Sequence, residues 1–182
     1  MSEITNRGQQ GLSYKVYLDG KPVEIERKWL ISFPDIKILE KQENYSVSSI
    51  EQLYITGNEN SVGDRLRKRD YGDHIKYYWT HKDNINGISR FEYEKEILSE
   101  EYERLSKKIR QNTSIIRKMR HTFKYNTQIV EIDIYEFWND VATMEIELKS
   151  EEQQIFIPEF IEVIKEVTGD KDYSNFGLAC KY

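Results

Sequence analysis

Charged side chains recur at every second position in several stretches of this chain. The first stretch is VEIERKWL, residues 23–30, in which Glu24, Glu26 and Lys28 are two residues apart. In an extended strand, side chains two residues apart point to the same face of the sheet, so these three charges would share one face. A solvent-exposed face explains one such strand. On an inward face, the same side chains could bind a metal cation and an anion.

The spacing returns in later stretches, with both signs of charge. They contain Arg65 and Arg67; Arg90, Glu92, Glu94 and Glu96; Lys118 and Arg120; Glu131 and Asp133; and Glu145 and Glu147. A single exposed face can carry charges by chance, whereas strand after strand of this kind indicates a charged interior. Burying these charges without partners would be costly, so we expect internal ion pairs, a divalent cation and a polyanion to offset the cost.

The residue types of this interior favour a hard cation and phosphate. Its basic members are Lys28, Arg65, Arg67, Lys82, Lys118, Arg120 and Arg90. Carboxylate oxygens suit Mg²⁺ or Mn²⁺, and with three histidines and the single Cys180 a zinc site is not expected. Arginine can bind phosphate oxygens in a bidentate fork. The chain has neither a GxxxxGK[ST] nor a GxGxxG motif, so side chains would have to recognise the phosphate.

Alternating stretches and turn signals predict the strands that position these residues. The strands are expected at about 22–31, 47–57, 62–71, 74–82, 88–97, 113–124, 128–136 and 141–149. Turns are expected at residues 57–58, 71–73, 84–87 and 125–126. About eight strands, mostly linked as hairpins, favour a mainly β fold, a closed antiparallel barrel that places every second side chain inside.

A few helices should flank the barrel. They are expected at 34–42, at 100–111 with Ser99 as N-cap, and at 158–167 with Pro158 in the first turn. Residues 1–20 are polar and aperiodic, so we expect a loose N-terminal arm in which 14–18 could add a short strand. The expected domain covers residues 21–182.

Composition limits the partners. The chain has 182 residues, enough for one domain with a sizeable core, and 27 basic against 32 acidic residues give a net charge of −5. This charge gives no reason to expect a nucleic-acid or membrane partner. There is no apolar run long enough to span a membrane and no signal-peptide pattern, and a single cysteine permits no internal disulfide. We therefore expect a cytoplasmic protein with a small-molecule partner. A homodimer is one option for its assembly.

Several segments, in order, resemble the CYTH domain, or triphosphate tunnel metalloenzyme, superfamily. The first is EIERK (24–28), which resembles the ExExK signature of that family. The others are QLYIT (52–56), RLRKR (65–69), YYWTHK (77–82), SRFEYEKEI (89–97), IRKMR (116–120), VEIDIY (130–135), MEIELKSEE (144–152) and VTGDKDYSN (167–175). The resemblance implies an eight-stranded tunnel that binds triphosphate-containing substrates with Mg²⁺ or Mn²⁺.

The resemblance also implies roles for individual residues. The metal ligands would be Glu24, Glu26 and Glu147, with Glu145 beside them. The triphosphate would be held by Lys28, Arg65, Arg67, Lys82, Arg90, Lys118 and Arg120. The implied catalytic residues are Lys28, Asp133, which would help to position a metal or water, and Glu145.

The function that follows is a metal-dependent triphosphatase, with inorganic triphosphate as the favoured substrate. Tyr77, Trp79, Phe91 and Tyr93 fall on the outward phase of their strands, which leaves few interior groups suited to a nucleobase. Tyr54, Tyr78 and Tyr135 share the interior phase and could cap a base. Three alternatives therefore remain: a thiamine triphosphatase, a class IV-type adenylate cyclase that forms cyclic AMP and pyrophosphate, and a non-catalytic polyphosphate-binding module.

Overall fold

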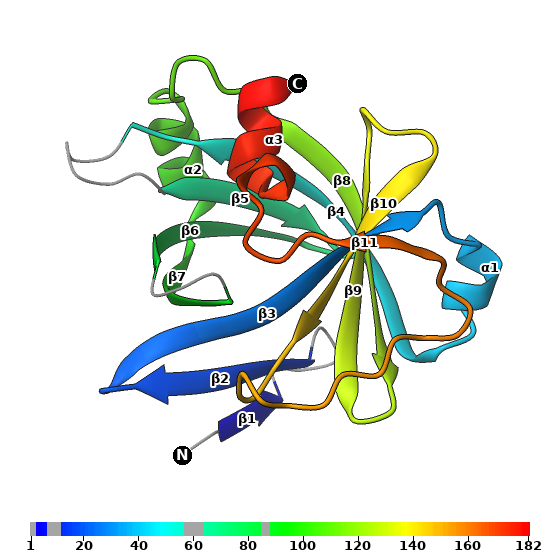
Figure 1. The fold of residues 1–182 in the computed structure, drawn as a ribbon. Helices are drawn as coiled ribbons and strands as arrows, with labels where there is room; N and C mark the ends of the chain where they lie inside the picture. Colours follow the sequence, from blue (N-terminus) through cyan, green and yellow to red (C-terminus); the bar gives the residue numbers. More distant parts are fainter. Residues whose placement is uncertain (1–2, 7–11, 57–63, 85–87) are drawn as a thin grey trace.

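Eight antiparallel strands close into a barrel in the computed structural model of the chain, which describes residues 3–6, 12–56, 64–84 and 88–182 (Figure 1). The barrel strands are β3 (Lys21–Ser32), β4 (Glu43–Tyr54), β5 (Arg65–Asp70), β6 (Ile75–Asn84), β7 (Ser89–Ile97), β8 (Ile116–Tyr125), β9 (Gln128–Tyr135) and β10 (Val141–Glu147). Around the barrel they follow the order β3-β10-β9-β8-β4-β5-β6-β7, and β7 pairs with β3 to close the ring. The predicted eight-stranded, mainly β barrel is confirmed.

Strand register brings the charged positions onto one common face. Glu145 on β10 lies opposite Lys28 on β3 and opposite Glu131 on β9. Arg65 on β5 lies opposite Tyr54 on β4 and Thr80 on β6. Directly opposed residues project to the same side of a sheet, so the alternating charges of successive strands meet inside the barrel.

The largest apolar core lies on the outer face of the barrel. Its buried members are Val23, Ile25, Trp29, Ile31, Leu39, Phe123, Val130, Ile132, Ala142, Met144, Ile146, Leu148 and Ile161. Most come from β3, β8, β9 and β10, and Leu39 comes from α1 (Ile36–Leu39). Each large side chain buried in this way stabilises the fold by roughly 1.5–3 kcal/mol. The interior can therefore remain polar because the apolar core is built outside it.

A second apolar cluster lies under α2 (Ser99–Ser106). Tyr102 of this helix is buried with Leu53, Leu66 and Ile97, and Tyr77 and Trp79 pack against the same cluster. This contact supports the outward phase predicted for Tyr77, whereas Trp79, and Tyr93 with the same predicted phase, also line the interior cavity.

The C-terminal segment closes over one end of the barrel. It consists of η1 (Lys171–Tyr173) and α3 (Asn175–Lys181), and Figure 1 shows α3 in red beside the end of β8. Leu178 and Ala179 are buried against Tyr54, Ile116 and Tyr135. At Gly177 an added Cβ would lie 2.0 Å from the Lys171 carbonyl oxygen, so only glycine lets η1 pack this closely on α3. This C-terminal segment was not predicted to be helical.

Additional strands extend the sheet. β2 (Leu12–Leu18) contains the short strand suggested for 14–18 and pairs with β3 from Val16 to Leu18, while β1 (Glu3–Asn6) pairs with β2. The domain boundary between residues 20 and 21 remains a prediction.

The helix predicted for 158–167 is wrong, because this segment contains β11 (Val163–Glu166) instead. β7 pairs with β3 only from Val23 to Ile25, and β11 pairs with β3 farther along, from Trp29 to Ile31. The β-branched Val163 and Ile164 suit this addition. Backbone hydrogen bonding to the free edge of β3 thus determines the structure of this segment, although Pro158 is a residue type that often begins a helix.

The helices that are present are short. α2 ends at Ser106 rather than at 111, and its N-cap is Leu98 rather than Ser99, whose hydroxyl lies 3.2 Å from the Glu100 carboxylate. In the described part of the chain, every helix is too short or too polar to cross a membrane. The turn at 71–73 is confirmed by Gly72 at φ 93°, and that at 125–126 by Asn126 at φ 54°. The loop predicted at 57–58 and most of the turn at 84–87 fall on residues that are not described.

Candidate active site

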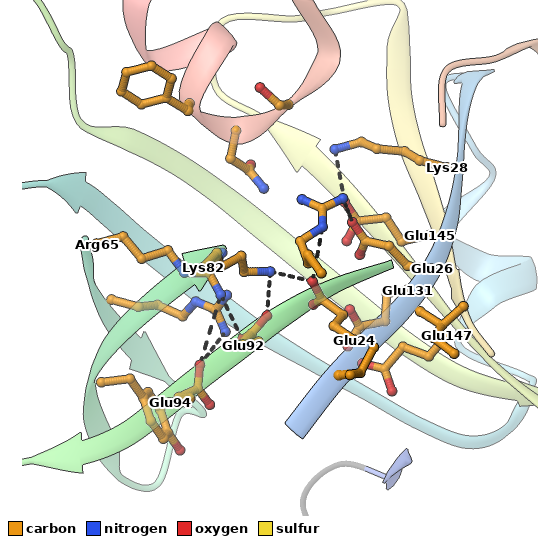
Figure 2. A pocket seen from close by; sticks show the side chains of 18 of the residues that line it. Glu24, Glu26, Lys28, Arg65, Lys82, Glu92, Glu94, Glu131, Glu145 and Glu147 are labelled. Atoms are coloured by element: carbon orange, nitrogen blue, oxygen red, sulfur yellow. Dashed lines mark hydrogen bonds and ion pairs between the residues drawn. The ribbon is translucent and has the colours of Figure 1, made fainter. Parts of the chain in front are cut away.

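A cavity of about 1230 Å³ occupies the barrel interior (Figure 2). Its wall contains charged residues from β3 and from β5 to β10, together with part of the C-terminal segment. Ten of the twelve predicted site residues line it: Glu24, Glu26, Lys28, Arg65, Lys82, Arg67, Arg90, Arg120, Glu145 and Glu147. Lys118 and Asp133 are the two that do not.

Carboxylates gather on the side of the cavity formed by β3 and β10. Glu26 and Glu147 are directly opposed in the β3–β10 ladder, and Glu24 lies two residues before Glu26 on the same face. Figure 2 shows these side chains, with Glu131 and Glu145, on one side of the pocket. Like charges directly opposed across two strands repel each other, so this side of the cavity favours an added cation.

Glu24 takes part in an ion-pair network that ties β3 to β6 and β7. Lys82 Nζ donates to Glu24 Oε2 at 2.5 Å and also pairs with Glu92, while Arg90 Nε lies 3.6 Å from Glu24. Burial, followed by the charges of Glu26 and Glu92, raises the pKa of Glu24 to about 8 despite the neighbouring cations. Burial and the two neighbouring carboxylates thus disfavour the charged form of Glu24, even with Lys82 bound.

Two guanidinium groups of β5 are incompletely paired, those of the buried Arg65 and the half-buried Arg67. Arg65 Nη2 lies 3.2 Å from Glu92, whereas the ion-pair partner of Arg67 among the described residues is Glu94, whose Oε2 lies 3.7 Å from Arg67 Nη1, too far for a hydrogen bond. Within the described residues, the buried Nε atoms of both arginines lack a hydrogen-bond partner. Burial, then the charges of Arg65 and Arg120, lower the pKa of Arg67. Arg67 would gain contacts and charge balance from an anion in the cavity.

Among the described residues, Arg120 has more carboxylate partners than any other predicted phosphate-binding group. Its Nε and Nη2 each donate to Asp133 at 2.7 Å in a bidentate pair, and Nη2 also donates to Glu145 at 2.8 Å. Lys28 Nζ pairs with the other oxygen of Glu145 at 2.9 Å. Although burial opposes it, the charges of Lys28 and Arg120 keep the pKa of Glu145 well below its usual range. This preorganised cluster holds two cations at the cavity wall.

Lys118 and Asp133 lie behind that cluster instead of at the cavity wall. Their side chains are each 1% exposed, and Lys118 Nζ lies 2.5 Å from Asp133 Oδ2 and 3.2 Å from Asn175 Oδ1. Burial lowers the pKa of Lys118 to about 7. The structure thus places Lys118 against α3 and Asp133 against Arg120, and in this arrangement neither contacts the space that a substrate would occupy.

The donor set fits a hard divalent cation in part. Glu24, Glu26 and Glu147 offer carboxylate oxygens on adjacent strands, as Mg²⁺ and Mn²⁺ prefer. Glu145 fits less well because Lys28 and Arg120 bind both of its oxygens. Among the described residues, no three His, Cys, Asp or Glu side chains already converge as a metal site. Metal binding would therefore require Glu24 and Glu26 to exchange Lys82 and Arg90 for the cation.

Sequence reasoning missed the contribution of α3 to this site. Asn175 and Phe176 line the cavity, and the Asn175 amide oxygen accepts hydrogen bonds from Lys118 and, at 2.9 Å, from the Tyr135 hydroxyl. The available signal was Ser174, a residue type that caps helices, whose hydroxyl accepts from the Gly177 N–H at 3.0 Å. Of the tyrosines on the interior phase, Tyr54 and Tyr78 line the cavity, and Tyr135 is buried beside Lys118.

Comparison with known proteins gives consistent similarities. Residues 22–169 match the CYTH domain. An inorganic triphosphatase of Acetivibrio thermocellus is 33% identical over 156 residues, which is 85% of this chain and 92% of that protein. A solved structure of an inorganic triphosphatase is 29% identical and superposes with a TM-score of 0.53, covering 86% of this chain and 94% of the other. A protein from Pyrococcus horikoshii OT3 shares the fold, with a TM-score of 0.54 at 17% identity over 71% of this chain and 80% of that one.

Proposed function

This chain belongs to the CYTH domain family, and we propose that it is a divalent-metal-dependent hydrolase of triphosphates, with inorganic triphosphate as its main substrate. Its 33% identity to an inorganic triphosphatase supports this substrate. The observation that carries the proposal is the pair Arg65, which is buried, and Arg67, which is half-buried: both cations lack full partners and share one cavity with opposed carboxylates.

Substrate binding would complete the coordination of the basic side chains. Arg65 and Arg67 would turn their unused donors to phosphate oxygens, and Lys82 and Arg90 would be released to the phosphates when the carboxylates bind the cation. Arginine donates to phosphate in a planar fork, which fixes both the position and the orientation of each phosphoryl group. Four cations from three strands would in this way hold a short, highly charged anion.

The carboxylate side would hold the metal through Glu24, Glu26 and Glu147. A divalent cation there would neutralise phosphate charge and bring the substrate against the basic side chains. The raised pKa of Glu24 supports this assignment because burial and the charges of Glu26 and Glu92 disfavour its carboxylate form, which a bound cation would stabilise.

Hydrolysis would proceed by in-line attack of water on a terminal phosphorus. A bond forms from the water oxygen to phosphorus, the P–O bond to the bridging oxygen breaks, and pyrophosphate leaves. The proton lost by the water passes to a phosphate oxygen or to solvent, and orthophosphate is the second product. Arg120 and Lys28, fixed by Glu145, would stabilise charge on the transferring phosphoryl group. Asp133 would act through Arg120, whose guanidinium it holds by two hydrogen bonds.

A product assay tests the proposal. Purified protein is incubated with Mg²⁺ or Mn²⁺ and with inorganic triphosphate, thiamine triphosphate or ATP. The proposal expects orthophosphate from inorganic triphosphate at a higher rate than from ATP. Cyclic AMP from ATP would identify a cyclase, and binding of triphosphate without turnover would identify a binding module. Faster hydrolysis of thiamine triphosphate than of inorganic triphosphate would be consistent with the same mechanism but would identify thiamine triphosphate as the main substrate.

A further inference from the structure

We propose that Phe176 of α3 determines substrate specificity by closing one end of the cavity, together with Tyr54, against organic groups attached to a triphosphate. The inference rests on the proposed function, because it names the residues that distinguish inorganic from organic triphosphates at the same site. Its basis is an aromatic wall placed directly beside the phosphate-binding arginines.

The wall consists of two rings in edge-to-face contact. Tyr54 and Phe176 both line the cavity, and their ring centroids lie 5.0 Å apart with an interplanar angle of 80°. This geometry is favourable for an aromatic pair and leaves no gap between the rings for another group. Tyr54 is only 5% exposed. The pair therefore forms a continuous aromatic surface in a cavity whose described wall is otherwise a mixture of charged, aromatic and aliphatic side chains, with Tyr78, Trp79 and Tyr93 among them.

Both rings are held in place by further contacts, and Arg110 takes part on both sides. The guanidinium carbon of Arg110 lies 5.0 Å from the Phe176 ring centroid, and the Arg110 backbone N–H donates to the Tyr54 carbonyl at 2.8 Å. The Tyr54 hydroxyl accepts a hydrogen bond from Gln52 Nε2 at 2.8 Å. α3 itself is anchored by the burial of Leu178. A wall fixed in this way resists displacement by an incoming substrate.

The wall lies next to the phosphate-binding groups. Tyr54 is directly opposite Arg65 in the β4–β5 ladder, so their side chains start from neighbouring positions on the cavity face. Burial raises the pKa of the Tyr54 phenol to about 12, and the charges of Arg65, Arg67 and Lys28 oppose that rise, which indicates that the phenol lies among these cations. A phosphoryl group bound by Arg65 would thus lie next to Tyr54, and Phe176 would lie directly beyond Tyr54.

Space beside Arg65 is therefore limited to an unsubstituted phosphoryl group. Inorganic triphosphate has such a group at both ends and satisfies this limit in either direction. A nucleoside or thiamine triphosphate carries an organic group at one end, so the wall would exclude the orientation that places this end beside Arg65 and leave only the reverse orientation. Removing the Phe176 ring should admit the organic group and raise the activity toward organic triphosphates relative to inorganic triphosphate.

The test compares Phe176→Ala with Phe137→Ala. Phe137 stacks on Tyr182 at 4.2 Å and packs in the same cluster as α3, but it is not among the residues that line the cavity. Both variants lose an aromatic contact with the C-terminal region, whereas only Phe176→Ala opens the wall. For each protein, kcat/KM for ATP and for inorganic triphosphate is measured with Mg²⁺, and the dissociation constants of both are measured by calorimetry without metal.

We expect Phe176→Ala to raise the ratio of kcat/KM for ATP to kcat/KM for inorganic triphosphate by about tenfold, which is within the range by which an apolar pocket discriminates between substrates. Phe137→Ala should leave this ratio unchanged. An unchanged ratio in Phe176→Ala, or an equal rise in Phe137→Ala, would overturn the inference. Phe176→Leu and Phe176→Trp preserve apolar packing on α3 if the alanine variant does not fold, and they should shift the ratio in opposite directions. Absence of phosphate release by the wild type would refute the proposed function, and the ratio of dissociation constants would then decide the role of Phe176.

Discussion

Glu26 of β3 and Glu147 of β10 are directly opposite each other, and both side chains line the same cavity. Opposed carboxylates on neighbouring strands destabilise a sheet unless a cation lies between them or close by. Arg90 supplies part of this charge, because its Nη2 donates to Glu26 at 2.8 Å. The repulsion between Glu26 and Glu147 should lower the stability of the metal-free barrel, and a divalent cation bound between them would offset it.

Neutralising either carboxylate should abolish activity while preserving the fold. Glu26→Gln and Glu147→Gln each remove one charge from the cation site, and we expect kcat/KM for inorganic triphosphate to fall by about 100-fold or more. The melting temperature should stay close to that of the wild type, because each change also relieves repulsion. Steady-state phosphate release and a thermal melt provide the two readouts.

The control for this experiment is Glu43→Gln. Glu43 forms an ion pair with Lys124 at 2.7 Å, its side chain is 61% exposed, and it is outside the cavity wall. Its activity should equal that of the wild type. Retention of activity in Glu26→Gln would show that the proposed carboxylates do not hold an essential cation.

Metal binding should stabilise the folded protein independently of catalysis. A ligand that binds only the folded state raises the free energy of unfolding in proportion to the logarithm of its concentration. We expect Mg²⁺ and Mn²⁺ to raise the melting temperature of the wild type, and to do so much less in Glu147→Gln. An equal rise in both proteins would indicate that the cations bind elsewhere.

Arg67→Ala should weaken the activity toward every triphosphate alike. Arg67 would contact the triphosphate group that all the substrates share, so KM should rise or kcat should fall by a similar factor for inorganic triphosphate and ATP. The matched control is Arg117→Ala on β8, because the Arg117 side chain is 48% exposed, pairs with Glu51 at 3.2 Å and does not line this cavity. A loss confined to ATP would contradict the assignment and place Arg67 near the nucleoside.

The pH dependence of stability should reveal the buried Lys118. Burial lowers its pKa in the folded protein to about 7, from 10.5 in the unfolded chain. Between these values the unfolded chain binds more protons, so stability should rise with pH from 7 towards 10.5, by at most about 1.4 kcal/mol per pH unit. Lys118→Met should lose this dependence. Urea unfolding of both proteins at pH 7, 8 and 9 measures it, and parallel curves would contradict the low pKa.

The two-residue spacing of the charged side chains was sufficient to predict most of the barrel. Charges recur at every second position of the strands that contain Glu24, Arg65 and Glu145, so the charges of each strand lie on one face. Closure of the sheet into a barrel directs that face inward. Residue phase gives the face of a strand but not the depth along it. Lys118 has the same phase as Arg120, yet it is covered by Asn175 of a helix far away in the sequence. Depth depends on which segments cover the barrel ends, and local pattern does not contain that information.

The C-terminal region shows the same limit. The segment 158–167 has a proline and charged residues that suit a helix, but it forms β11 because β3 offers an edge at Trp29–Ile31. Phe176 follows no alternating pattern, and only the packing of α3 on Tyr54 brings it to the cavity. Both features arise from contacts between segments that are distant in the chain, and so neither could be predicted from spacing alone.

The most direct test of a metal-dependent triphosphate site is the rate of orthophosphate release from inorganic triphosphate, by wild type and Glu26→Gln, in Mg²⁺ and in excess chelator. We predict rapid release only for the wild type with Mg²⁺, and near-background release in the other three conditions. Wild-type release that continues undiminished in excess chelator would contradict the account.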